Sequence, residues 1–180
     1  MIARTPSQTI GPFFHVGLKW DDGEKTLFAG SGERVVLTGC VYDGSGASIA
    51  DALIETWQAD PFGAVPGAGA LPRPLGYSRI FTNEHGQYTL ETLMPGACPG
   101  PEGERFAPQL SVTIFARGLL KAVRTRVFLA SADAVRDDPL IRAAGARAAT
   151  LVAVRDAQDA SLWRWNVRLQ GKDETAFIAT

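Results

Sequence analysis

The chain has 180 residues, a formal net charge of −1 and 46% hydrophobic residues. A chain of this length can bury a substantial core, and we predict a single domain over residues 1–180, with residues 1–33 as an N-terminal arm and loop. Dispersed charges do not favour a nucleic-acid or anionic-membrane surface, and no apolar run reaches the ~20 residues that span a bilayer.

The first segment with structural information is the arm over residues 5–15, which follows neither a strand nor a helix period. Its two prolines and its glycine favour an extended, irregular course. Ile10, Phe13 and Phe14 nevertheless need a surface to cover, either on this chain or on another. The beginning of the chain lacks the apolar stretch of a secretory signal, which predicts a cytoplasmic protein.

The central stretch reads as two strands, residues 36–42 and 52–59, joined by the turn Asp-Gly-Ser-Gly at 43–46. Gly and Asp between β-branched and aromatic runs are typical of a hairpin. The second strand carries apolar residues on both parities, so we expect it to be buried on both faces. Trp57 is its largest residue and the predicted centre of the core.

The remaining chain reads mostly as strands. Residues 77–82 and 87–92 flank a predicted four-residue hairpin loop, and residues 109–117 and 123–129 alternate between apolar and polar side chains. Residues 131–149 form the helical region, which Pro139 and Gly145 should divide into short helices. Residues 150–154 and 162–170 close the sheet. The pattern predicts an all-β protein: an antiparallel β-sandwich with long irregular loops.

The residue types that usually carry chemistry are scarce. Cys40 and Cys98 have no close spacing and are read as two reduced thiols. His15 and His85 are more commonly ordinary surface histidines than metal ligands, since no His/Cys pairing accompanies them. Trp163 and Trp165 alternate with charged residues on one strand, which favours a place in the core over a ring-binding platform.

Longer motifs carry a family resemblance. Asp-Gly-x-Gly, then Ala-Leu-Ile-Glu-Thr-Trp-Gln-Ala-Asp, then a glycine two residues before Val65 resembles the intradiol ring-cleavage dioxygenases. Two narrower stretches, Thr-Pro-Ser-Gln-Thr-x-Gly-Pro-Phe in the arm and Phe-Ala-Arg-Gly-Leu at residues 115–119, are similar to the alpha chains of the heteromeric family members that act on protocatechuate. The resemblance covers most of the chain.

The family holds a non-haem ferric iron with two tyrosines and two histidines. The histidines stand two residues apart on one strand, where alternate side chains share a face and can reach one ion. The resemblance puts the four ligand positions on Val65, Cys98, Gln109 and Ser111. None of these is a tyrosine or a histidine, so we expect no metal site and no catalytic residue in this chain, and Fe³⁺ in a partner beta subunit.

By resemblance, alpha and beta chains form higher alpha–beta oligomers that cleave protocatechuate between its hydroxyls with O₂, giving 3-carboxy-cis,cis-muconate in the β-ketoadipate pathway of aromatic catabolism. The alpha chain then contributes a wall of the site, with Arg117, Gly11 and Pro12 near the substrate and Thr9 and Phe13 beside them. Gly11 permits close backbone approach, and Arg117 offers a planar fork to a carboxylate.

Two simpler interpretations remain open. Arg117 is also consistent with a strand-end arginine that reaches into water or pairs with an acidic side chain. The whole chain is also consistent with a metal-free β-sandwich that serves as a binding or scaffolding module, because fold alone does not establish function. Purification as a stable monomer would favour that module.

Overall fold

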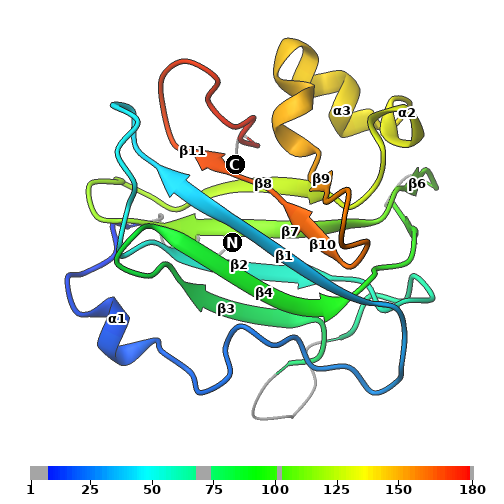
Figure 1. The fold of residues 1–180 in the computed structure, drawn as a ribbon, viewed down its shortest axis with the longest axis horizontal. Helices are drawn as coiled ribbons and strands as arrows, with labels where there is room; N and C mark the ends of the chain where they lie inside the picture. The colour runs from blue at the N-terminus through cyan, green and yellow to red at the C-terminus, as the bar shows by residue number, and fades with distance from the viewer. Residues whose placement is uncertain (1–7, 68–73, 101–102, 179–180) are drawn as a thin grey trace, which may run out of the picture.

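Two β-sheets pack face to face, with short helices at one end and an N-terminal segment at the other (Figure 1). The computed structural model describes residues 8–67, 74–100 and 103–178. Residues 1–7, which include the start of the predicted arm, lie outside the described residues. The described arm is not wholly extended, because α1 (Phe14–Gly17) forms a single helical turn.

The first sheet is built around β1 (Arg34–Tyr42), which begins where the predicted arm and loop end. On one side β1 pairs antiparallel with β4 (Gln87–Leu93). On the other side it pairs in parallel with β10 (Leu162–Arg164) and then β11 (Val167–Arg168), and β9 (Val154–Arg155) extends the sheet beyond β10. The predicted antiparallel sandwich therefore includes two parallel pairings.

The second sheet is antiparallel and runs in the order β3 (Tyr77–Phe81), β2 (Leu53–Gln58), β7 (Gln109–Phe115) and β8 (Val123–Phe128). The alternating pattern of residues 109–117 and 123–129 correctly predicted the two strands β7 and β8, which the structure pairs with each other. A separate small ribbon joins β5 (Cys98–Pro99) to β6 (Arg105–Phe106) near the start of β7.

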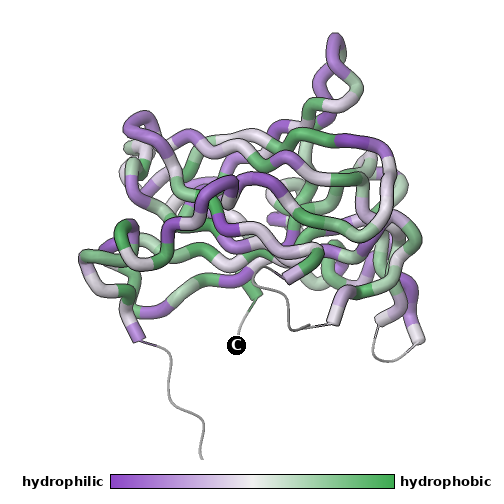
Figure 2. Tube along the Cα trace, turned by 90° about the horizontal axis from the view of Figure 1, so that it is seen from below, coloured by the Kyte–Doolittle hydropathy of each residue, from purple (hydrophilic) through white to green (hydrophobic). Residues whose placement is uncertain are grey.

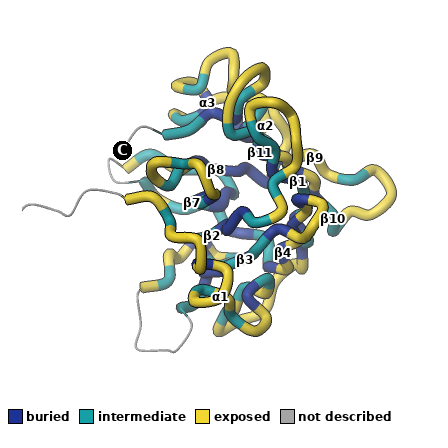
Figure 3. Tube along the Cα trace, turned by 90° about the vertical axis from the view of Figure 1, so that its left-hand side faces the viewer, coloured by how far each residue is buried: buried dark blue, intermediate teal, exposed yellow. Residues whose placement is uncertain are grey.

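The core fills the space between the two sheets, and buried segments concentrate in the strands (Figure 3). Along the strands hydrophobic and hydrophilic residues intermingle, as alternation between an inner and an outer face requires (Figure 2). Trp163 and Trp165 are 5% and 4% exposed and belong to this core, which confirms their sequence-based interpretation. Its largest fully buried members include Leu37, Ile54, Leu90, Leu110 and Ile114.

Both predicted hairpins are wrong in their pairing. The turn at 43–46 connects β1 of the first sheet to β2 of the second, and the turn at 83–86 connects β3 of the second sheet to β4 of the first. Asp43 and Asn83 each accept hydrogen bonds from backbone N–H groups two and four residues ahead, at 2.8–2.9 Å. These side chains reverse the chain locally, but the strands they separate belong to different layers.

Trp57 is not the centre of the core. It lies on the outer face of the second sheet, half-buried, with its ring 4.8 Å from that of Tyr77. Alternation explains this position, since Ile54 and Thr56 point inward and Trp57 has the opposite parity. The inner face of the strand is buried as predicted, but on its outer face Glu55 and Trp57 are only partly buried, so the prediction of burial on both faces holds only in part.

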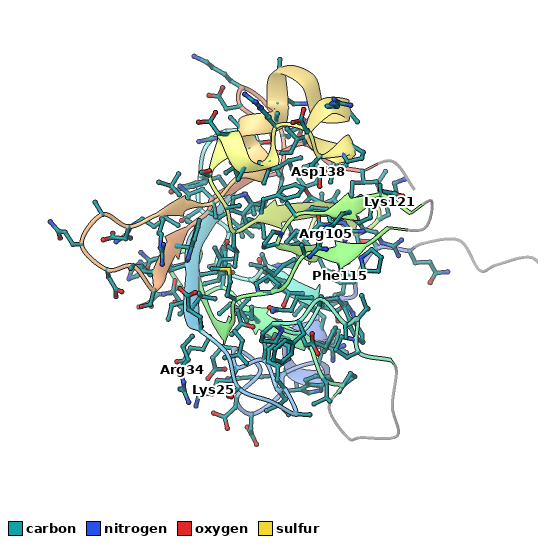
Figure 4. The ribbon with its side chains drawn as sticks, turned by 90° about the vertical axis from the view of Figure 1, so that its right-hand side faces the viewer. Lys25, Arg34, Arg105, Phe115, Lys121 and Asp138 are labelled. Carbon is teal, nitrogen blue, oxygen red and sulfur yellow. The ribbon has the colours of Figure 1, made fainter. Side chains whose placement is uncertain are left out.

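The helical region divides as predicted into α2 (Ala132–Val135), α3 (Pro139–Ala144) and a 3₁₀ helix, η1 (Gly145–Leu151). Pro139 is the first residue of α3, where its missing N–H costs nothing, and Gly145 ends that helix at φ 54°. Asp138, labelled in Figure 4, caps α3 by accepting from Leu140 N at 2.9 Å. None of the described helices is long and apolar enough to cross a membrane.

Candidate functional site

The N-terminal segment packs against the outer side of the second sheet. Phe14 is buried, and its ring centroid lies 5.8 Å from that of Phe81 in β3. The carbonyl of Phe13 accepts from the N–H groups of Val16 and Gly17, which closes the turn of α1. The Phe13 side chain itself points into solvent and is 77% exposed. The arm therefore buries one of its aromatic rings on its own chain and leaves the other uncovered.

A tight turn after β7 fixes the position of Arg117. Leu119 N donates to Ala116 O at 3.2 Å, and Gly118 between them has φ 87°, a conformation that glycine adopts without strain. The hydroxyl of Thr9 donates to Leu119 O at 2.7 Å. The arm and the Arg117 turn, more than a hundred residues apart in sequence, are therefore tied together.

The guanidinium of Arg117 forms an ion pair through Nε with Oδ2 of Asp51. Asp51 lies in the turn just before β2, and Thr82 anchors that turn from behind. The Oγ1 atom of Thr82 donates to Ile49 O at 2.7 Å and accepts from Ala52 N at 2.9 Å. Because the Thr82 side chain is buried, the backbone on both sides of Asp51 is held firmly.

A cleft of about 390 Å³ opens beside this ion pair. His15, Lys19 and Arg117 contribute basic groups to it, and Asp51 is the acidic residue among its lining side chains. The balance of charge suits an organic anion of modest size. Pro12, Phe81 and Thr82 complete much of the wall.

The residues that the sequence predicted to form a wall of the site all lie near the Arg117 cleft, but only some of them line it. Pro12 and Arg117 line the cleft, and Thr9 does not line it but is hydrogen-bonded to Leu119 in the turn that carries Arg117. Gly11 and Phe13 are exposed beside it without lining it. A Cβ atom on Gly11 would meet nothing within 4 Å, so no contact within the described chain requires a glycine there.

The sequence-based interpretation missed Asp51, His15 and Lys19 as members of the cleft. His15 had been read as an ordinary arm histidine, and its side chain is exposed. Asp51 lies in a turn just before a strand, which is a common place for an acidic residue. No spacing in the sequence relates it to Arg117, 66 positions further along.

The four positions that the family resemblance assigns to iron ligands lie at the opposite end of β7. Gln109 and Ser111 begin the strand, whereas Arg117 follows its end, so about 20 Å of strand separates Ser111 from Arg117. Cys98 lies in β5 and Val65 in the loop after β2. These two loops adjoin, because a Cβ atom on Gly63 would collide with the carbonyl oxygen of Ala97.

The side chains at these four positions do not fit ferric iron. A valine, a thiol, a carboxamide and a hydroxyl replace the phenolates and imidazoles that the ion needs. Val65 is 66% exposed, while Gln109 is buried and its Oε1 has no hydrogen-bond partner among the described residues. In the part of the chain that the structure describes, no group of three or more His, Cys, Asp or Glu side chains could hold a metal.

A larger cleft of about 550 Å³ is lined by none of the predicted site residues. Its lining includes Lys25 and Arg34, which Figure 4 labels. The Lys25 ammonium lies 2.8 Å from the Asp22 carboxylate, and this partner raises the pKa of Lys25. Volume alone does not identify a binding site, and nothing in the sequence motifs points to this cleft. The smaller cleft at Arg117 is therefore the candidate.

Comparisons with known proteins agree with the motifs. A family model described as Dioxygenase matches residues 10–171. The chain is 38% identical over 198 residues to the protocatechuate 3,4-dioxygenase alpha chain of Burkholderia cepacia, with 98% of each chain covered, and 32% identical over 195 residues to that of Pseudomonas putida, with 99% and 97% covered. It is also 38% identical over 74 residues to the Burkholderia cepacia beta chain, covering 38% of this chain and 32% of that one.

Solved structures support the fold. The 3-chlorocatechol 1,2-dioxygenase of Rhodococcus opacus 1CP aligns with a TM-score of 0.63 at 22% identity, covering 91% of this chain and 71% of that one. At this identity the likeness concerns the fold alone. It confirms the predicted β-rich architecture with few short helices.

Proposed function

The chain belongs to the intradiol dioxygenase family, and on that premise we propose that it is the alpha subunit of a protocatechuate 3,4-dioxygenase. The iron-bearing beta subunit is its proposed partner. The assembled enzyme adds both atoms of O₂ to protocatechuate and opens the ring between its two hydroxyls, which gives 3-carboxy-cis,cis-muconate. We place this catabolic reaction in the cytoplasm.

The observation that carries the proposal is the contrast between the two ends of β7. One end holds the positions of the missing ligands, Gln109 and Ser111, and the other end opens into the cationic cleft at Arg117. A chain without its own metal ligands gains nothing from a substrate cleft unless another chain supplies the reactive centre. A wall for a partner's site accounts for both features.

The chemistry of protocatechuate suits this cleft. The molecule carries a carboxylate on the side of the ring opposite its hydroxyls. Arg117 would bind that carboxylate through charge-assisted hydrogen bonds, and Lys19 would add positive potential. The hydroxyls would then point away from this chain toward the partner's iron. Pro12 and the arm would exclude water from the carboxylate end of the substrate.

The beta subunit would also cover exposed apolar side chains at this end of the molecule. Phe13, Val16 and Leu120 are 77%, 70% and 87% exposed, which is unusual for large hydrophobic residues on one region of a surface. The beta-chain relative resembles part of this chain, so we propose that two similar sandwiches meet here and complete one site between them.

Co-expression with a candidate beta chain tests the function. The purified complex should contain iron, take up oxygen with protocatechuate and release the carboxymuconate, while this chain alone should do none of these. A chain that purifies as a stable monomer, and that adds nothing to the activity of the beta chain, would support the metal-free module instead. Size-exclusion chromatography, elemental analysis and an oxygen electrode are sufficient for this test.

A further inference from the structure

We propose that Asp51 is a positioning residue, which turns the Arg117 guanidinium so that its free edge faces the substrate carboxylate. The proposal rests on the proposed function and deepens it. Its starting point is the ion pair between Asp51 Oδ2 and Arg117 Nε at the margin of the cleft. Exposed ion pairs are common and usually contribute little, but the surrounding hydrogen bonds hold this pair in place.

The ion pair leaves a defined part of the guanidinium free. An arginine side chain presents two donor edges, one formed by Nε with one Nη atom and the other formed by the two Nη atoms. The contact with Asp51 uses Nε, so the edge formed by both Nη atoms remains for a bidentate carboxylate. Among the described residues Arg117 makes no other ion pair.

Asp51 is the more rigid partner of the two. Its side chain is 25% exposed against 68% for Arg117. The hydrogen bonds from Thr82 to Ile49 and from Ala52 to Thr82 hold the turn that carries the carboxylate. The long arginine side chain would otherwise sample many rotamers, and the ion pair restricts them before substrate arrives.

The charge of Asp51 also has an opposing effect, because a carboxylate beside the cleft repels a carboxylate in the substrate. The positive charge of Lys19, which also lines the cleft, offsets part of that repulsion. The orienting effect and the repulsive effect predict opposite changes in substrate affinity when Asp51 is replaced by a neutral residue. Loss of orientation weakens substrate binding, whereas loss of repulsion strengthens it, so one substitution separates the two.

The experiment uses the assembled alpha–beta holoenzyme with Asp51→Ala, Asp51→Asn, Arg117→Ala and the double variant Asp51→Ala/Arg117→Ala. We expect Asp51→Ala to raise the KM for protocatechuate about fivefold to tenfold with little change in kcat. Turnover of catechol, which lacks the carboxylate, should hardly change. Asp51→Asn retains an acceptor oxygen and should fall between wild type and Asp51→Ala.

The double variant should bind protocatechuate no more weakly than Arg117→Ala alone, because Asp51 favours binding only through Arg117. Asp137→Asn is the matched control, since Asp137 is an exposed acid 3.5 Å from Arg142 in the helical region. An unchanged or lowered KM in Asp51→Ala would overturn the proposal. It would also be overturned if the KM increase of the double variant equalled the product of the increases in the two single variants. Equal losses with protocatechuate and catechol, or a dissociated complex, would show a structural role instead.

Calorimetry with 4-hydroxybenzoate, which carries the carboxylate but lacks the second hydroxyl, separates this proposal from the proposed function. If the wild-type complex takes up no oxygen with protocatechuate, the proposed function fails. Weaker binding of 4-hydroxybenzoate by Asp51→Ala, with no change for Asp137→Asn, would still support the positioning role. Equal binding by all three complexes would refute it.

Discussion

The carbonyl oxygen of Trp165 occupies the space that a side chain on Gly39 would need. A Cβ atom on Gly39 would overlap this oxygen, and the buried hydroxyl of Tyr88 donates to the same oxygen at 2.7 Å. The contact lies where β1 changes its parallel partner from β10 to β11. Glycine is thus required for packing, because it lets the neighbouring backbone pass close to the middle of β1.

Gly39→Ala should therefore destabilise the fold by about 3 kcal/mol, because the backbone of Trp165 cannot move aside without breaking both neighbouring pairings. Gly30→Ala is the control, since a Cβ atom there meets nothing within 4 Å, and it should shift stability by less than about 0.5 kcal/mol. Urea unfolding followed by circular dichroism measures both. Equal stability of Gly39→Ala and wild type would contradict the packing argument.

The isolated chain should bind no ferric iron tightly and should be colourless, because it lacks the tyrosinates that give this family of iron sites its charge-transfer absorption. Elemental analysis and visible spectroscopy of the chain expressed alone check this. Replacing Gln109 and Ser111 together by histidine should still not create a stable site, since Val65 and Cys98 also differ. Stoichiometric iron in the unmodified chain would refute the interpretation.

Arg117→Ala in the assembled enzyme should weaken protocatechuate binding roughly 10- to 150-fold, the value of a charge-assisted contact of about 1.5–3 kcal/mol. Catechol should be affected much less. Arg136→Ala, at an exposed arginine near α2, is the matched control and should leave the affinity for both substrates unchanged. Equal losses for the two substrates would point to a role of Arg117 in folding or assembly.

Deletion of residues 1–13 should leave the sandwich folded, because β1 begins only at Arg34. The truncation removes the Thr9–Leu119 hydrogen bond and the Phe13 carbonyl that closes α1. The part of the arm that remains, from Phe14 onward, should therefore detach from the cleft. Association with the beta subunit and affinity for protocatechuate should both fall. Circular dichroism, gel filtration and turnover are the measurements. Normal association with normal substrate affinity would exclude the proposed role of the arm.

Acid should remove a stabilising contribution from Asp156, in the loop between β9 and β10. Hydrogen bonds from the backbone N–H of Gln158, and then from the side chain of Arg164, lower the pKa of Asp156. A carboxylate with a lowered folded-state pKa stabilises the fold above its unfolded-state pKa of about 4 and loses that effect as pH falls through the folded-state value.

Asp156→Asn should consequently be less stable than wild type at pH 6, and the difference should shrink below about pH 4. Denaturant midpoints measured from pH 6 to pH 2.5 give the comparison. An NMR titration of the Asp156 carboxyl carbon reports the pKa directly. A stability difference that stays constant down to pH 2.5 would contradict this assignment.

Local patterns predicted the local elements well. The strands β7 and β8 follow from alternation, and the division of the helical region follows from Pro139 and Gly145. The hairpins at 43–46 and 83–86 failed because turn chemistry determines where the chain reverses, not which strand lies beside it afterwards. That choice belongs to the packing of whole sheets, and the same packing turned Trp57 outward.

The candidate site was predictable in part. Family motifs drew attention to Arg117 and Pro12, which line one cleft. Asp51 could not be found in this way, because its relation to Arg117 depends on how the β2 and β7 ends meet in the second sheet. The register Leu53 opposite Phe115 brings the turn before one strand beside the turn after the other.

The parallel pairing of β1 with β10 and β11 has a consequence for the order of assembly during synthesis. Val36 lies opposite Leu162, so the central strand of the first sheet waits for residues that are synthesised much later than its own. Until then one edge of β1 offers unpaired backbone groups to any neighbouring strand. Long-range pairings of this kind slow folding, and a nascent chain of this protein should therefore depend on chaperones more than a sandwich built from adjacent hairpins.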